Sequence, residues 1–311
     1  MKTKRNSCFL IIAAFIWGTA FVAQSTGGDL VGPYTFNCIR TFVGSIVLIP
    51  VILLLDKTGI SSKKPSTSSD RKMLWIGGIC CGIVLCIASN LQQVGLHLGT
   101  SAGKAGFLTA CYIVLVPILG LFLKKKCGWN VWISVVITVC GLYLLCIKGS
   151  FTLQFSDLLV LICSLCFSIH ILVIDHFSPL VDGVRMSCIQ FLVCGILTAI
   201  PMLVSDARAV GMASWITSLQ SGDAWFAILY AGILSSGVAY TLQIVGQNDV
   251  NPTIASLLMS LESVFAVLAG WAVLHERMSR RELLGCLLIF IAVVLAQVPV
   301  NNLLRKKRNK N

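Results

Sequence analysis

Glu262 is the first residue whose type and position suggest chemistry, because its carboxyl group falls in the middle of the apolar segment 252–274. If that segment crosses a bilayer, a charge at its centre costs roughly 2.5–3.5 kcal/mol or more, so the group has to face a cavity or a partner. One role is an acid that binds a ligand or exchanges protons. The other is a protonated carboxyl held between helices by Ser263 or another neighbour, and the sequence gives the two roles equal weight.

Polar side chains also recur at helical spacing in two other apolar segments, so that each set falls on one helix face. The sets are Cys86, Asn90, Gln93 and His97 in 73–95 and just beyond it, and Ser236, Tyr240, Gln243 and Gln247 in 223–245 and just beyond it. Neutral polar groups suit a zwitterionic or polar ligand. The alternative is hydrogen bonding between helices, worth about 0.6 kcal/mol on average in membranes. We favour a cavity lining.

Four further side chains could complete such a cavity. Gln24, Trp17 and Tyr112 would extend its lining, although an aromatic residue in a helix more often serves packing. His170 is a candidate proton relay because imidazole titrates near neutral pH, and a core histidine with satisfied hydrogen bonds is the competing interpretation. The predicted substrate-binding residues are therefore Trp17, Gln24, Asn90, Gln93, Tyr112, Tyr240, Gln243 and Glu262, and the predicted proton-coupling residues are Glu262 and His170.

Two cations lie inside or beside apolar segments. Arg40 could pair with Glu262, bind a carboxylate through two parallel hydrogen bonds, or extend towards the membrane surface, and we slightly favour a structural role. Lys104 stands among glycines at the start of the segment 102–123. We interpret it as an interfacial anchor, with guidance of anionic substrates as the alternative.

Several kinds of chemistry lack their motifs in this sequence. It has no phosphate-binding Walker loop, no paired metal ligands and no nucleophile elbow, so we expect neither a cofactor nor a bound metal. The fourteen cysteines are spread through apolar segments. Cys163 and Cys166 form a C-x-x-C pattern within such a segment, and we interpret them as small packing residues rather than redox or metal-binding groups.

Composition indicates which elements position these residues. Hydrophobic residues make up 57% of the 311-residue chain and charged residues only 12%, with a mean hydropathy of +0.89. Soluble domains carry about twice that share of charge, so the pattern predicts an all-α integral membrane protein with ten transmembrane helices. The predicted spans are 8–26, 33–55, 73–95, 102–123, 129–147, 157–177, 184–204, 223–245, 252–274 and 283–303.

The basic residues predict the orientation. Sixteen of the 24 Lys and Arg residues precede the first span, follow the last, or lie in the loops after the second and fourth. Because cytoplasmic loops are rich in Lys and Arg, both termini are predicted to be cytoplasmic, in the cell membrane. The loop 275–282 disagrees, since it holds Arg277, Arg280 and Arg281 on the outer side. The net charge of +12 forms no basic stripe with interleaved aromatics, so we expect no nucleic-acid partner.

A shift of 150 residues superimposes the two polar stripes and pairs Trp17 with Phe167 and Ala105 with Ala255. Each predicted half contains five spans, an odd number, so the second half enters the membrane from the opposite side. Two such halves form an inverted repeat with a site near the membrane midplane, which can open alternately to either side.

The segments 15–20 (FIWGTA), 100–119 and 255–276 resemble the EamA family of the drug/metabolite transporter superfamily. The resemblance covers two repeats, 8–148 and 157–303. It implies transport of amino acids, other small metabolites or drugs through a central cavity. Many first repeats of the family end in Gly-Glu where this chain has Lys124–Lys126, which suggests that the acidic end is not essential.

We therefore predict a secondary active transporter, and more specifically an exporter, of a small organic metabolite such as an amino acid or drug-like compound, rather than an enzyme. The expected partners are that substrate and membrane lipids, and a homodimer is left open. A polytopic membrane enzyme is the first alternative, but its histidines would cluster, whereas His97, His170, His176 and His275 are scattered. A channel is the second, but a single inverted repeat does not supply the symmetric filter of a channel.

Overall fold

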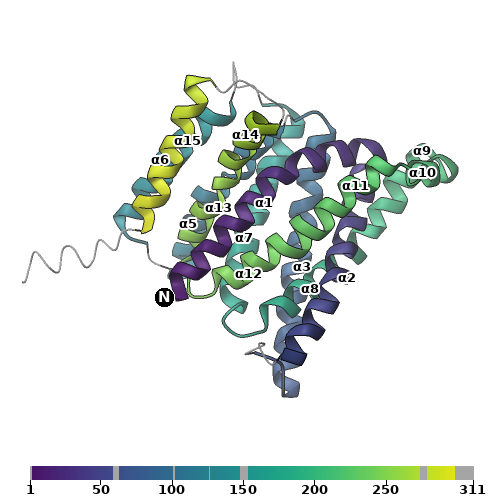
Figure 1. Ribbon diagram of the computed structural model, residues 1–311, viewed down its shortest axis with the longest axis horizontal. Helices are drawn as coiled ribbons and strands as arrows, with labels where there is room; N and C mark the ends of the chain where they lie inside the picture. Colours follow the sequence, from purple (N-terminus) through teal and green to yellow (C-terminus); the bar gives the residue numbers. More distant parts are fainter. Residues whose placement is uncertain are drawn as a thin grey trace, which may run out of the picture.

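The computed structural model describes residues 2–58, 63–100, 102–125, 127–147, 153–273 and 279–297, and no strand occurs among them. The described chain is an all-helical bundle (Figure 1). Its elements are α1 (Lys2–Val31), α2 (Pro33–Thr58), α3 (Ser68–His97), α4 (Ala102–Thr109), α5 (Tyr112–Phe122), α6 (Trp129–Cys146), α7 (Phe155–Phe177), α8 (Gly183–Pro201), η1 (Met202–Ala207), α9 (Arg208–Val210), α10 (Met212–Ser218), α11 (Gly222–Tyr230), η2 (Ala231–Tyr240), α12 (Thr241–Gln247), α13 (Pro252–Met259), α14 (Leu261–Val273) and α15 (Arg280–Gln297).

Seven described helical segments are long and apolar enough to cross a membrane. They are Pro33–Thr58, Ser68–His97, Lys104–Phe122, Trp129–Cys146, Phe155–Phe177, Gly183–Val210 and Gly222–Gln247. Arg5–Ala20 and Pro252–Leu268 are apolar but shorter, and α15 begins with Arg280, Arg281 and Glu282. The protein is therefore a multi-span helical membrane protein. The structure supports seven spans by length and composition where the sequence predicted ten.

Two predicted spans, 102–123 and 252–274, are each broken in the structure at matching positions. Ala110 and Cys111 separate α4 from α5, and Ser260 separates α13 from α14. At the first break the backbone tightens, with Cys111 N–H donating to the Leu108 carbonyl. At the second, the Ser260 hydroxyl donates to the Leu257 carbonyl at 2.7 Å. Such serine-to-backbone bonds bend helices.

Helices α2 and α8 contact each other along their length, and the contact has matching halves. Near one end, the Cys38 thiol donates to the Gly195 carbonyl at 3.5 Å. Near the other, the Cys188 thiol donates to the Ser45 carbonyl at 3.5 Å. Cys188 follows Cys38 by 150 residues, and Gly195 follows Ser45 by 150. The two contacts are thus the same contact with the partners exchanged.

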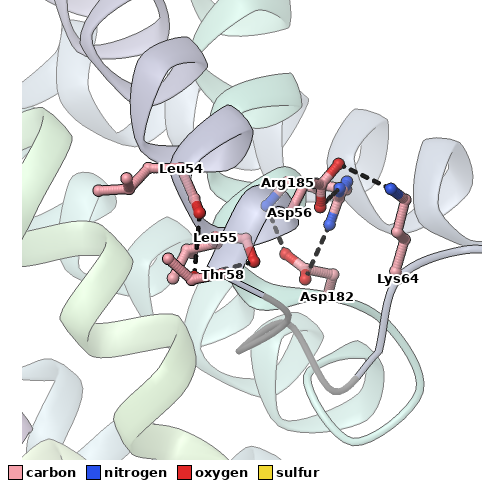
Figure 2. Close-up of polar contacts among 7 residues, drawn as sticks. All are labelled: Leu54, Leu55, Asp56, Thr58, Lys64, Asp182 and Arg185. Atoms are coloured by element: carbon pink, nitrogen blue, oxygen red, sulfur yellow. Dashed lines mark hydrogen bonds and ion pairs between the residues drawn. The ribbon is translucent and has the colours of Figure 1, made fainter.

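Polar groups join both ends of this helix pair. At one end Arg185 of α8 binds Asp56 of α2 and, at 3.1 Å, Asp182, while Lys64 binds Asp56 at 3.0 Å (Figure 2). We call these four residues the Asp56–Arg185 cluster. At the opposite end Asp206 of η1 accepts hydrogen bonds from the backbone and hydroxyl of Thr35, at 2.7 and 2.9 Å. The α2–α8 pair is therefore fastened at both ends in one and the same conformation.

Two glycines show how closely α3 and η2 approach this pair. A methyl group added at Gly82 of α3 would lie 2.7 Å from the Val193 Cβ of α8. One added at Gly232 of η2 would lie 2.8 Å from the Val43 Cβ of α2. Gly232 follows Gly82 by 150 residues, and Val193 follows Val43 by 150. Farther out in the bundle, α6 packs against α15, the pair at the upper left of Figure 1.

Candidate functional site

A cavity lies between the helices, with about 510 Å³ of space that includes its opening to solvent. The residues that line it come from α1, α2, α3, α4, α5, α7, η2, α12, α13 and α14. They are Trp17, Gln24, Arg40, Gln92, Thr109, Tyr112, Phe167, Ile171, Ser235, Tyr240, Gln243, Met259 and Glu262.

The breaks in the two interrupted helices lie at this cavity. Thr109 and Tyr112 flank the break between α4 and α5, and Met259 and Glu262 flank the break at Ser260. Because hydrogen bonding is irregular at such breaks, they are places where helices present polar backbone and side chains to a cavity. The two breaks face the cavity as a pair, 150 residues apart.

Six of the eight predicted substrate-binding residues line this one cavity. They are Trp17, Gln24, Tyr112, Tyr240, Gln243 and Glu262. The structure therefore brings together side chains from five separate elements that the sequence analysis had named individually, and their role in binding stays a prediction.

The other predicted residues lie outside the cavity lining. Asn90 accepts a hydrogen bond from Asn37 at 2.9 Å and donates one to Thr198 at 2.9 Å, so its amide is occupied between α2 and α8. Gln93 donates to the Gln24 carbonyl at 2.8 Å. His170 is fully buried, and its Nε2 lies 3.1 Å from Gln190 Oε1. Its Nδ1 is buried without a hydrogen-bond partner, so only one ring nitrogen is satisfied, and a role in proton coupling stays a prediction.

Gln92 lines the cavity and was missed, because the comparison of the two stripes used a constant shift. Its Nε2 donates to Thr109 Oγ1 at 3.0 Å. Up to the start of η2, matching contacts are separated by 150 residues. In α12, which follows η2 directly, they are separated by 151. The hydrogen bond between Asn37 and Asn90 recurs between Thr241 and Ser187, and the approach of Gly95 to Val160 recurs as that of Gly246 to Leu10.

The cause is the π-helical segment η2, which spans Ala231–Tyr240. A π turn accommodates one more residue than an α turn and often lies at a functional site. With that extra residue counted, Gln243 corresponds to Gln92 rather than to Gln93, and both line the cavity. Apolar periodicity carries no clear signal for a single inserted residue.

Glu262 is the second residue of α14, and only 6% of its surface is exposed. Its carboxyl group makes no hydrogen bond or ion pair with any residue that the structure describes. The Ser263 hydroxyl, proposed from the sequence as its structural partner, is itself buried without a hydrogen bond. Glu262 lines the cavity, and its role as a binding or proton-coupling acid stays a prediction.

Arg40 also lines the cavity and is only 3% exposed, so it does not extend to the membrane surface. Its Nε donates to Asn37 Oδ1 at 2.7 Å, and its Cζ lies 5.6 Å from the centre of the Phe36 ring. No ion pair within 4.0 Å joins Arg40 to Glu262, in contrast to one of the pairings considered from sequence.

Aromatic rings form one wall of the cavity. The Trp17 and Tyr240 rings meet edge to face at a centroid distance of 4.8 Å. Trp17 Nε1 donates to the Ser235 carbonyl at 3.4 Å, within η2. Phe191 packs behind Tyr240 at 5.7 Å. This wall offers an apolar surface on which the body of an organic ligand can stack.

Lys104 does not reach the cavity. Its ammonium group binds Asp157, which is 1% exposed and also accepts hydrogen bonds from Thr100 and from the Gln154 backbone. The pair links the start of α7 to the start of α4, so Lys104 is a contact between helices and not an interfacial anchor alone.

Within the described ranges no group of three or more His, Cys, Asp or Glu residues could hold a metal ion. All fourteen cysteines are free thiols, and Cys163 is fully buried. The residues His275, Glu276, Arg277 and Lys126, together with the basic end of the chain, lie outside the described residues.

Comparison with known proteins identifies the family. The EamA-like transporter family matches the chain twice, over residues 5–147 and 154–297. An uncharacterized transporter of Archaeoglobus fulgidus is 27% identical over 292 residues, covering 94% of this chain and 85% of that protein. The uncharacterized inner membrane transporter YedA of Escherichia coli is 22% identical, covering 90% of this chain and 86% of that protein.

A WAT1-related chloroplastic protein of Arabidopsis thaliana is 26% identical, covering 94% of this chain and 69% of that protein. A solved structure described as the crystal structure of a protein aligns with a TM-score of 0.76, over 96% of this chain and 99% of that one. Its identity of 17% makes it a likeness of fold alone. Because the two family matches together span most of the chain, this membrane transporter belongs to the EamA-like transporter family.

Proposed function

We propose that this protein is a secondary active transporter that exports a small organic metabolite by alternating access, with the cavity as its substrate site. The observation that carries the proposal is Glu262, a buried carboxyl group that faces the cavity and has no partner among the described residues. An unpartnered acid inside a membrane protein is costly, so it is retained where a substrate or a proton occupies it. Glu262 is accordingly our candidate for substrate binding and proton coupling.

The inferred architecture is ten spans in two inverted halves. The contacts between α2 and α8 that recur with exchanged partners support it. So do the paired helix breaks at the cavity and the two successive family matches. The short apolar helices Arg5–Ala20 and Pro252–Leu268 and the helix α15 supply the three spans beyond the seven.

In such an architecture, rocking of the two halves exposes the central site to one side and then to the other. With both termini on the cytoplasmic side, as the basic loops suggest, the Asp56–Arg185 cluster lies at the cytoplasmic face and Asp206 at the outer face. The cell membrane is the compartment that these features and the family favour.

The test is transport by the purified protein reconstituted into vesicles, with labelled amino acids, nucleobases, sugars and drug-like cations supplied in turn. Saturable flux that is accelerated by unlabelled substrate on the opposite side is expected of a carrier. Flux that never saturates and shows no counterflow would instead favour a channel. No flux above that of empty vesicles for any compound would contradict the proposed transport.

A further inference from the structure

Arg40 is a second charged group in the cavity, and its position needs an explanation that the proposed transport does not supply. It lines the same cavity as Glu262 and is 3% exposed. A guanidinium group remains charged in proteins, and a buried charge is tolerated only with a counter-charge or a full set of hydrogen bonds.

The described residues accept only some of the hydrogen bonds that this guanidinium group can donate. Nε donates to Asn37 Oδ1 at 2.7 Å. The terminal nitrogens Nη1 and Nη2 make no hydrogen bond with the described residues, and no carboxylate among those residues lies within 4.0 Å. The remaining donors and the positive charge are therefore left to whatever enters the cavity.

Hydrogen-bonded side chains also hold the guanidinium group in place. Asn37, which accepts from Arg40, donates its own amide to Asn90 Oδ1 at 2.9 Å. Asn90 donates in turn to Thr198 Oγ1 at 2.9 Å. This chain of amides fixes the guanidinium plane from α2 through α3 to α8. It also gives Asn90 a positioning role in place of the cavity contact predicted from sequence.

We propose that Arg40 is the anion subsite of the cavity and that the transported compound carries a carboxylate group, which the two terminal nitrogens bind. This inference rests on the proposed function and narrows its substrate class. A planar guanidinium fork matches a carboxylate through two parallel hydrogen bonds. The aromatic wall of Trp17 and Tyr240 would then contact the apolar body of the compound.

The experiment compares carboxylates with their primary amides, in which the negative charge of the carboxylate is removed. The purified protein is melted in the presence of 3-phenylpropionate, indole-3-propionate or phenylalanine, and in parallel with the primary amide of each. A ligand that binds only the folded protein raises the melting temperature. We expect stabilisation by at least one carboxylate, with its amide binding more weakly by on the order of tenfold to a hundredfold.

Two variants assign that preference to Arg40. Arg40→Gln should abolish the preference of carboxylate over amide, and Arg40→Lys should retain a weaker one, because an ammonium group binds carboxylate as a point charge. If Arg40→Gln fails to fold, the proposal is still tested by the Arg40→Lys variant and by the comparison of each acid with its amide in the unmodified protein.

Equal stabilisation by acid and amide would overturn the proposal, as would an undiminished preference in Arg40→Gln. Stabilisation only by neutral or cationic compounds would overturn the anion subsite and leave the proposed transporter intact. The proposed function itself fails only if transport is also absent from reconstituted vesicles, so the two failures are distinguishable.

Discussion

The cavity and the Asp56–Arg185 cluster both hold buried or half-buried charged residues, and of these two regions only the cluster has its charges paired. Arg185 binds two carboxylates there, and Asp56 also binds Lys64 (Figure 2). In the cavity, Arg40 and Glu262 face the same space without forming an ion pair. Where charges are paired with each other they hold helices together, and where they are left unpaired they are available to a ligand.

The α2–α8 contact sharpens this contrast. Both of its ends are fastened at once, by the Asp56–Arg185 cluster and by the Thr35–Asp206 bonds. A gate that closes one side of a carrier would be fastened at one end only. Under the proposed alternating access, the α2–α8 pair would be a rigid contact between the two proposed halves, and the broken helices around the cavity would be the part that moves.

The largest effect should follow a change of Glu262. Glu262→Gln keeps the size of the side chain but removes the titratable carboxyl group, so it should lower transport by roughly a hundredfold or more if the acid couples transport to protons. Vesicle flux measured with and without a pH gradient is the readout. Full proton-driven flux in this variant would remove Glu262 from the mechanism.

Overpacking where α3 and η2 approach the α2–α8 pair should affect stability instead. Gly82→Ala and Gly232→Ala insert a methyl group within 3.0 Å of α8 and α2 atoms respectively, and each should destabilise the protein by about 1–3 kcal/mol. Gly222→Ala is the matched control, because nothing lies within 4 Å of the added methyl group. Thermal melting of the three variants is the measurement, and equal melting temperatures would contradict the close contact.

Arg185→Gln tests the paired charges directly. The change leaves Asp56 and Asp182 side by side without the cation between them, so the melting temperature should fall by a few degrees. The affinity for a cavity ligand should stay the same, since Arg185 does not line the cavity. Weaker ligand binding in correctly folded Arg185→Gln would contradict the separation of the paired charges from the ligand site.

The neighbours Gln92 and Gln93 test the register set by η2. Gln92→Ala removes a cavity amide and should weaken ligand binding by about tenfold or less. Gln93→Ala removes the bond to the Gln24 carbonyl and should cost about 1 kcal/mol of stability without a change in affinity. Ligand-induced melting shifts compare the two, and the reversed result would restore the constant shift of 150.

The smallest effect is expected at the middle of the α2–α8 pair. Ser45→Cys places a thiol beside Cys188, whose sulfur lies 3.4 Å from the Ser45 hydroxyl. A disulfide formed there by mild oxidation should leave transport unchanged, because a rigid contact does not separate during the cycle. Flux is measured after oxidation and again after reduction with dithiothreitol. A loss of flux that dithiothreitol reverses would show that α2 and α8 move apart.

Several features of the site could be read from individual residues. Glu262 is conspicuous because a carboxyl group in a long apolar segment has few structural uses. Trp17, Tyr112 and Tyr240 combine an apolar body with a polar tip, which suits a cavity wall. Arg40 could not be assigned, since a long cation can extend to the surface, pair with Glu262 or face a cavity, and the sequence does not indicate which.

The sequence by itself determined that the chain is a helical membrane protein, because apolar length and scarcity of charge decide which solvent a segment tolerates. It also indicated the 150-residue correspondence that pairs Trp17 with Phe167, since that depends on chain order alone. Only the tertiary structure decided which amides face the cavity. One extra residue in a π turn shifts the residues of α12 that follow it, and an amide faces a ligand or another amide according to contacts made across the bundle.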